Sequence, residues 1–330
     1  MKEYIIGPNE AGQRLDKYLK KLLALAPDSF LYKMLRKKNI TRNKKAAAGS
    51  EKLAEGDCIT LFLSDETIEK FRQKRTDRPA GAGKVSGLPV EILYEDQHVL
   101  LLNKPAGVLS QPDASHQVSM VEWVTSYLLE KGVLTAQDLA TFRPAVCNRL
   151  DRNTSGILAA GKSLPGSQGL SELFRERKVK KYYFCLVHGQ IREPMDLRGY
   201  LCKNRKSNRV FMEDSPSENS VFIHTRYRPV EVSEAYTLLE AELITGKTHQ
   251  IRAQLLAHGY PIAGDPKYGN PVLDRPLKKR FGSFAQLLHA RRLVFDGLDG
   301  ALSGLSHREI TAPLPEQFEK IKKEIMYHEH

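Results

Sequence analysis

Residues 65–88 interrupt the hydrophobic periodicity of the chain. This segment, DETIEKFRQKRTDRPAGAGKVSGL, gathers charged residues, glycine and proline and shows no regular spacing of apolar side chains. Such a composition is typical of a flexible linker between folded parts. With 330 residues, the chain is long enough for about two domains of roughly 150 residues each. We therefore predict a small domain over residues 1–64 and a larger domain over residues 89–330.

The small domain shows two amphipathic helices and a short strand. Apolar residues recur at spacings of three and four over residues 14–26 and again over residues 28–38, which predicts the two helices. Apolar side chains alternate over residues 59–63, which predicts a half-buried strand. Together these elements predict a compact α+β unit.

Between positions 33 and 45 the chain carries seven basic residues and no acidic one. This density predicts a surface that binds phosphates, and a solvated helix face is the alternative. The whole chain has 51 Lys and Arg against 39 Asp and Glu, a formal net charge of +12. Nucleic acid is the commonest polyanionic partner of such a protein. The predicted phosphate-binding residues are Lys33, Arg36, Lys37, Lys38, Arg42, Lys44 and Lys45.

Several classes of protein are disfavoured by what the sequence lacks. No apolar run approaches the roughly 18 to 20 residues of a membrane helix, and the amino terminus MKEYIIGPNEAG lacks the apolar stretch of a signal peptide. We therefore expect a soluble cytoplasmic protein. The 4 cysteines contain no Cys-x-x-Cys pair and the 10 histidines show no ligand spacing. Neither a disulfide framework nor a metal site is expected from these patterns.

From Pro89 onward, short β-rich runs such as KKYYFCLVHG mix irregularly with helical stretches such as SQGLSELFRERK. There is no regular alternation of strand and helix and no internal repeat, so a doubly wound nucleotide-binding fold is not favoured. The predicted fold class is α+β, with a mixed or antiparallel sheet and flanking helices.

Residues 156–163, GILAAGKS, match the phosphate-loop pattern G-x-x-x-x-G-K-[ST]. Such a loop must follow a buried strand and begin a helix, so that free backbone N–H groups bind the phosphates. Here the preceding residues are polar and turn-like, and the four intervening residues are apolar and suit a strand. We interpret the segment as a strand. A phosphate-loop nucleotidase is an alternative that would require nucleotide binding sensitive to Lys162→Ala.

Residues 148–156, NRLDRNTSG, place Asp151 between two arginines and before small and hydroxyl residues. Taken alone, an aspartate in this position can simply hydrogen-bond to its own turn. The segment closely resembles the signature Arg-Leu-Asp-x-x-Thr-Ser-Gly of RluA-type pseudouridine synthases. Many members have histidine immediately before Arg-Leu-Asp, where this chain has Asn148.

The resemblance extends over roughly residues 90–318, with further motifs in the family's order. Residues 12–63 also resemble the small RNA-binding domain shared by a small-subunit ribosomal protein and tyrosyl-tRNA synthetases. The further catalytic-domain motifs are Asn103–Gly107, Lys181–Tyr183 with Val187–Gly189, Gly246–Arg252, Gly264–Gly269, Leu287–Ala290 and Ala312–Pro315.

The resemblance implies a pseudouridine synthase fold and the isomerisation of RNA uridines to pseudouridine without a cofactor. It implies that Asp151 is the nucleophile and that Arg252 is its ion-pair partner. It also implies that Tyr183 stacks on the flipped uracil, with its phenol near enough to help remove the ring proton late in the reaction; a core aromatic is the alternative. Neighbouring side chains of a strand point to opposite faces, so Tyr182 is expected to point away from the pocket.

Further residues are expected near the substrate. Ile251 resembles the apolar residue that packs beneath the tyrosine, and Arg149 is expected to approach the RNA where the base has left its stack. Lys104 is expected near the substrate, and both Lys104 and Lys181 are interpreted as structural or phosphate-contacting residues rather than chemical participants.

Three histidines, His249, His258 and His289, are left out of the predicted site because no acid or nucleophile partner is identified for them. The resemblance implies large-subunit ribosomal RNA as the substrate, with tRNA as a possible second one, and we expect a monomer that binds neither membrane nor nucleotide cofactor. The alternative is a noncatalytic RNA-binding or ribosome-assembly factor on the same fold.

Overall fold

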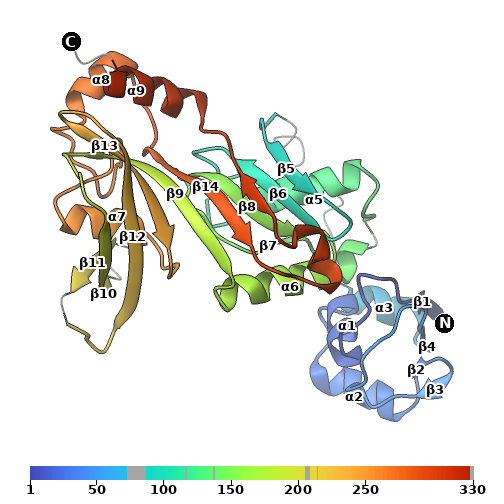
Figure 1. The fold of residues 1–330 in the computed structure, drawn as a ribbon. Helices are drawn as coiled ribbons and strands as arrows, with labels where there is room; N and C mark the ends of the chain where they lie inside the picture. The colour runs from blue at the N-terminus through green and yellow to red at the C-terminus, as the bar shows by residue number, and fades with distance from the viewer. Residues whose placement is uncertain (73–86, 116, 137, 205–208, 214, 328–330) are drawn as a thin grey trace.

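The computed structural model describes residues 1–330 except 73–86, 116, 137, 205–208, 214 and 328–330. Its strands form two sheets, one of four strands near the amino terminus and one of eleven strands. Figure 1 shows the small sheet with its helices, in blue, at one end of the molecule and the carboxyl terminus at the other.

The small sheet pairs its strands in the order β1-β4-β2-β3 and packs against two helices. Both helices fall within the predicted ranges and bury apolar side chains such as Leu19 and Leu31. The turn between β2 and β3 has positive φ at Asn43 and Lys44, as a two-residue type I′ hairpin requires. The elements are β1 (Lys2–Ile5), α1 (Leu15–Leu22), α2 (Asp28–Arg36), β2 (Ile40–Arg42), β3 (Lys45–Ala46) and β4 (Cys58–Leu61).

The prediction that a linker begins at residue 65 is wrong, because a further helix, α3 (Asp65–Phe71), belongs to the small core. Ser64 caps this helix by accepting a hydrogen bond from Thr67 N at 3.2 Å. Ile68 is fully buried, and the ring of Phe71 lies 4.6 Å from that of Phe30. The helix is too short for its apolar spacing to stand out among its charges. Most of the rest of the predicted linker, residues 73–86, lies outside the described residues.

The large sheet has the order β11-β10-β12-β13-β9-β14-β8-β6-β5, with β15 beside β14 and β7 beside β8. Its pairs are antiparallel except β14 with β8, which is parallel, so the predicted mixed sheet is confirmed. Its strands are β5 (Glu91–Glu95), β6 (Val99–Lys104), β7 (Ala145–Val146), β8 (Ser155–Gly161), β9 (Val179–His188), β10 (Met195–Asn204), β11 (Arg209–Glu213), β12 (Ser220–Val232), β13 (Tyr236–Leu243), β14 (Leu288–Phe295) and β15 (Glu309–Thr311).

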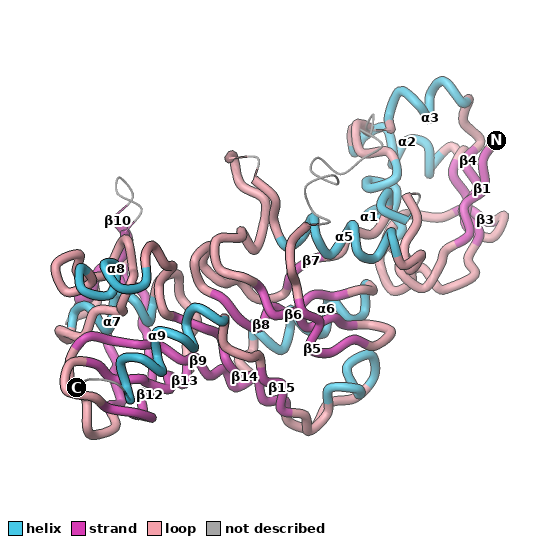
Figure 2. Tube along the Cα trace, turned by 90° about the horizontal axis from the view of Figure 1, so that it is seen from above, coloured by secondary structure: helices cyan, strands magenta, loops and turns pink. Residues whose placement is uncertain are grey.

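Helices flank this sheet, as the α+β prediction requires. An apolar cluster joins α5 to β6, β8, β9 and α7, and a second cluster joins α6 and η2 to the same sheet. Helix α9 packs against β13 (Figure 2). No helix in the described part of the chain has the length and apolarity to cross a membrane. The helices are α5 (Met120–Glu130), η1 (Asp138–Ala140), α6 (Leu164–Arg175), α7 (Gln250–Ala257), α8 (Arg275–Phe281), η2 (Gly300–Leu305) and α9 (Glu316–Tyr327).

The segment GILAAGKS forms the strand that its apolar residues predict. Every residue of β8 is buried, and residues 156–161 pair with β6, so the backbone of the segment is engaged in the sheet. Lys162 Nζ donates to Glu95 Oε1 at 2.5 Å, and Ser163 caps α6. No phosphate loop exists at this position, which disfavours the nucleotidase alternative.

Candidate active site

Asp151 lies in the loop that leads into β8. The preceding residue, Leu150, is buried, and its N–H and carbonyl both bond to Ser110 Oγ, at 3.1 and 2.7 Å. Thr154 N donates to Asp151 O at 3.0 Å and closes the turn through the backbone. The Asp151 side chain is 24% exposed. The loop is therefore anchored in the core while its carboxylate reaches toward solvent.

The carboxylate of Asp151 is bonded to Arg252, which a second carboxylate holds in place. Arg252 Nη1 donates to Asp151 Oδ2 at 2.6 Å. Arg252 Nε and Nη2 donate to Asp265 Oδ2 and Oδ1 at 2.6 and 2.7 Å, in a bidentate pair. Burial lowers the pKa of Arg252, but the hydrogen bonds to Asp265 and Asp151 outweigh it and raise the pKa above its ordinary value. The guanidinium therefore stays charged, with its direction set by Asp265.

A tight turn places Asp265 beneath the arginine. The Asp265 carboxylate accepts from Lys267 N at 2.8 Å and Tyr268 N at 2.9 Å. A Cβ at Gly269 would lie 2.3 Å from Asp265 O, so only glycine fits there. The turn belongs to the motif Gly264–Gly269, whose spacing alone did not predict that Asp265 lies in the site.

Tyr183 lies on β9 between small neighbours, Ala241 on β13 and Ala290 on β14. It shares an apolar cluster with Leu150 and Ile251 and is 8% exposed. Burial raises the pKa of its phenol, and the Asp151 carboxylate is near enough to raise it further. The structure thus brings Asp151, Arg252, Tyr183 and Ile251 to one place, with Tyr183 as a neutral phenol.

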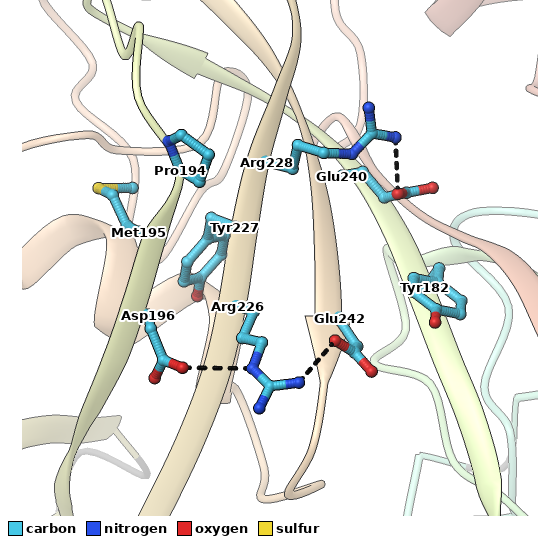
Figure 3. A pocket seen from close by; sticks show the side chains of 9 residues that line it. All are labelled: Tyr182, Pro194, Met195, Asp196, Arg226, Tyr227, Arg228, Glu240 and Glu242. Carbon is cyan, nitrogen blue, oxygen red and sulfur yellow. Dashed lines mark hydrogen bonds and ion pairs between the residues drawn. The ribbon is translucent and has the colours of Figure 1, made fainter.

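Tyr182 faces the other side of β9, as strand alternation predicts. It pairs with Glu242 and Arg292 and lines a cavity of about 380 Å³ (Figure 3). The charges in this cavity neutralise one another, since Arg226 contacts Asp196 at 3.2 Å and Glu242 at 3.4 Å. This cavity is separate from the site around Asp151.

Lys104, predicted near the substrate as a structural or phosphate-contacting residue, is fully buried and has structural partners. Its Nζ donates to Pro105 O at 2.9 Å, Val108 O at 2.7 Å and Arg152 O at 3.0 Å. Burial lowers the pKa of Lys104 to about 7, and the Asp151 carboxylate opposes that shift. Lys104 therefore ties the NKPAG loop to the loop of Asp151. The sequence alone could not show that carbonyls from both loops converge on its ammonium.

His249 was wrongly left without a partner in the sequence analysis. Its Nε2 lies 3.9 Å from Asp151 Oδ2, and its Nδ1 lies 2.9 Å from Tyr268 Oη. Burial lowers the pKa of His249; Asp151 opposes the shift, and Arg252 and Lys267 add to it. The imidazole is therefore favoured in its neutral form. Its place one helical turn before Arg252 was the signal that could have revealed it.

The other two histidines have structural partners. His258 Nδ1 lies 2.8 Å from Gln254 O at the end of α7. His289 is fully buried on β14, with Nδ1 2.9 Å from Ser155 Oγ.

Comparison with known proteins places this geometry in a family. A family model described as RNA pseudouridylate synthase matches residues 98–257. The chain is 33% identical over 319 residues to "Ribosomal large subunit pseudouridine synthase C" of Vibrio vulnificus, covering 96% of this chain and 94% of that protein. The chain belongs to the RNA pseudouridylate synthase family. It is accordingly an isomerase that acts on uridines in RNA.

Two more pseudouridine synthases support this placement. The protein of the same name from Escherichia coli K12 is 33% identical over 298 residues, which cover 88% of this chain and 87% of that protein. A solved structure of human RNA Pseudouridylate Synthase Domain Containing 4 superimposes with a TM-score of 0.59 at 22% identity, covering 74% of this chain and 95% of that one. The latter supports the fold alone.

Two residues just before Leu150 and Asp151 differ in exposure and bonding. Arg149 is exposed and has no hydrogen bond or ion pair with any described residue. Asn148, where many family members have histidine, donates to Ile157 O at 3.1 Å and accepts from Ala159 N at 2.7 Å. Asn148 therefore fastens the motif to the edge of β8, while Arg149 is available to RNA.

The predicted phosphate-binding residues near the amino terminus lie on α2, in the turn that follows it and in the β2–β3 hairpin. Arg42 is the exception, because its Nε bonds to the buried Asp57 at 2.7 Å. Asp57 lies outside the acid-free stretch of sequence, so the prediction missed this pair. The other six are exposed and form no ion pair with described residues: Lys33, Arg36, Lys37, Lys38, Lys44 and Lys45. We call these six the amino-terminal cations.

Proposed function

We propose that this pseudouridine synthase modifies uridine in large-subunit ribosomal RNA, with Asp151 as the nucleophile. The observation that supports the site is the chain of ion pairs from the buried Asp265 through Arg252 to the partly exposed Asp151, beside Tyr183. The printed names of the Vibrio vulnificus and Escherichia coli relatives support the substrate class. A tRNA would be a second substrate of the same chemistry.

Asp151 is suited to begin the reaction because only one of its oxygens is engaged. Arg252 bonds to Oδ2, and no described residue hydrogen-bonds to Oδ1. Attack of Oδ1 on the sugar C1′ would break the bond to uracil N1, with the electron pair leaving on the base. Formation of a glycal or addition to the uracil ring would start from the same carboxylate. In each route the base turns, C5 bonds to C1′, any bond formed to the Asp151 carboxylate breaks so that the carboxylate is released, and the C5 proton is lost.

Arg252 serves this chemistry by orientation. Because Asp265 grips two of its nitrogens, the third points at Asp151 with little freedom. A carboxylate held in one direction is already close to the geometry of attack, so the activation free energy is lower.

Tyr183 supplies the stacking surface for the flipped uracil. Stacking contributes about 1 to 3 kcal/mol per base, comparable with the few kcal/mol that base extrusion costs. Since burial and the Asp151 carboxylate raise the pKa of Tyr183, the phenolate is disfavoured. We therefore assign stacking to Tyr183 ahead of proton removal.

The amino-terminal part binds RNA in this proposal, through the amino-terminal cations. We propose that the protein acts as a cytoplasmic monomer, with the chemistry carried by its own side chains. The alternative of a noncatalytic RNA-binding factor is disfavoured by the retained Asp151, Arg252 and Tyr183.

The test measures tritium released from C5-labelled uridine in large-subunit ribosomal RNA. We expect release by the wild type and none by Asp151→Asn, while Asp299→Asn, at an exposed carboxylate, serves as the matched control and retains release. Equal release by Asp151→Asn would remove the nucleophile assignment. A wild type that binds this RNA but releases no tritium from it or from tRNA would support the binding-factor alternative.

A further inference from the structure

Among the described residues of the catalytic part, three lysines are buried, and one of them differs from the other two. Lys104 bonds to three backbone carbonyls, and Lys162 pairs with Glu95. Lys181 is 8% exposed and has no hydrogen bond or ion pair with any described residue. Its stem is buried, but its Nζ is not among the fully enclosed polar atoms that lack a partner, so a ligand can reach the ammonium.

Lys181 lies beside the catalytic residues. It is on β9 two residues before Tyr183, so both side chains leave the strand on the same side. Its Nζ is near Gly246, which begins the segment GKTHQIR that leads to His249 and Arg252. The unpartnered ammonium therefore sits at the edge of the site.

Gly246 leaves the approach to this ammonium open. The residue is exposed and does not have a positive φ, so backbone conformation does not require glycine there. A Cβ at this position would meet only Lys181 Nζ, at 3.7 Å. A longer side chain would cover the ammonium, whereas glycine lets a ligand come close.

The charged groups around Lys181 are cations. Burial lowers the pKa of Lys181, and the positive charge of Arg177 lowers it further. Lys247, next to Gly246, is exposed. Neither Arg177 nor Lys247 forms an ion pair with a described residue. Positive charge without a carboxylate at this place indicates an anionic ligand.

We propose that Lys181, with Arg177 and Lys247 at its rim, binds a backbone phosphate of the RNA beside the flipped uridine. The phosphate oxygens supply the acceptors that the folded chain lacks, and an RNA substrate brings such a group next to every base. The inference rests on the proposed RNA substrate, which the tritium assay on the wild type tests separately.

The experiment compares Lys181→Met with a matched control, Lys180→Met. Lys180 is the neighbouring lysine, 53% exposed and 3.7 Å from Asp296. Binding of large-subunit ribosomal RNA transcribed in vitro is measured from roughly 50 to 200 mM KCl. Losing one phosphate contact should lower the slope of log K against log salt by about 0.7 to 0.9 and raise Kd and KM several-fold. Lys180→Met should keep the wild-type slope, and Lys181→Arg should restore most of the affinity.

Thermal unfolding without RNA separates this role from a structural one. Since the Lys181 side chain forms no hydrogen bond or ion pair with a described residue and Met keeps its apolar stem, we expect Lys181→Met to unfold at about the wild-type temperature. A wild-type salt slope in Lys181→Met would overturn the proposal, and so would unfolding several degrees lower. Inorganic phosphate provides the last arm. If it stabilises the wild type but not Lys181→Met while both bind RNA equally, the site holds a free anion and the proposal fails.

Discussion

The charges of the catalytic centre and those of the amino-terminal part are arranged in opposite ways. Arg252 is buried and bonded to Asp151 and Asp265, and these bonds fix the position of its guanidinium. The amino-terminal cations are exposed and unpaired among the described residues. A fixed charge orients a reacting group, whereas free surface charges attract a polyanion over a distance. The comparison supports the proposed chemistry in the first region and the proposed RNA affinity in the second.

The largest effect is expected from breaking the buried ion pairs. Arg252→Ala would strand two carboxylates, so we expect a loss of about 3 to 5 kcal/mol in the free energy of unfolding. A misplaced nucleophile should also lower kcat about 100-fold or more. Urea unfolding and tritium release measure the two effects. Arg143→Ala, at an exposed arginine, is the control. A stable, active Arg252→Ala protein would refute the ion-pair role.

The second effect concerns acid stability of the catalytic part. His289 is fully buried, and burial lowers its pKa to about 4 from the usual 6.5. Between these values the unfolded chain binds a proton that the folded chain does not. Stability therefore falls as the pH falls from 6.5 toward 4, by about 3 kcal/mol in total, and this loss levels off below that window.

The amino-terminal part should respond at lower pH. Burial raises the pKa of Asp57, but hydrogen bonds from Ala54, Asn43 and Arg42 outweigh it and lower the pKa below 3.8. Its stabilising contribution is present above pH 3.8 and is lost as the pH falls through the lowered pKa. The large sheet should thus weaken first.

Fluorescence of Trp123 follows the acid unfolding of the part that contains the large sheet, because Trp123 is the chain's single tryptophan and lies on α5. His289→Asn should remove most of the stability loss above pH 4, whereas His307→Asn, at an exposed histidine, should keep it. An unchanged pH profile in His289→Asn would show that another group titrates.

Replacing the amino-terminal cations by glutamine should weaken RNA binding clearly. It should change the free energy of unfolding only slightly. Six lost phosphate contacts would lower the salt slope by up to about 4 to 5 and weaken RNA binding about tenfold or more. The unfolding free energy should change by less than about 1 kcal/mol, since surface substitutions seldom cost more. Filter binding across KCl concentrations measures the slope, and an unchanged slope would place RNA affinity elsewhere.

The smallest effect is expected at Arg42. Because its guanidinium is bound to Asp57, Arg42→Gln should leave the RNA salt slope near that of the wild type. It should cost roughly 1 kcal/mol of unfolding free energy, as a partly exposed ion pair does. If Arg42→Gln changes the slope as much as Lys37→Gln does, Arg42 also contacts phosphate.

Local patterns were enough to predict much of the fold. The spacing of apolar residues predicted α1 and α2, and the run GILAA predicted β8 against a misleading phosphate-loop match. The same patterns failed for α3, where the short apolar repeat of Ile68 and Phe71 is masked by charged neighbours. Periodicity reveals an element only when the element is long enough to repeat it.

The sequence by itself determined the residue types of the site, the order of its motifs and the family they resemble. Only the tertiary structure decided which charges meet. It joined Asp265 and Asp151 to Arg252, gave Arg42 the partner Asp57, enclosed Lys104 among carbonyls and left Lys181 without an acceptor. Spacing along a chain sets the face of a helix or strand, but the partner of a charge depends on which distant segments pack together.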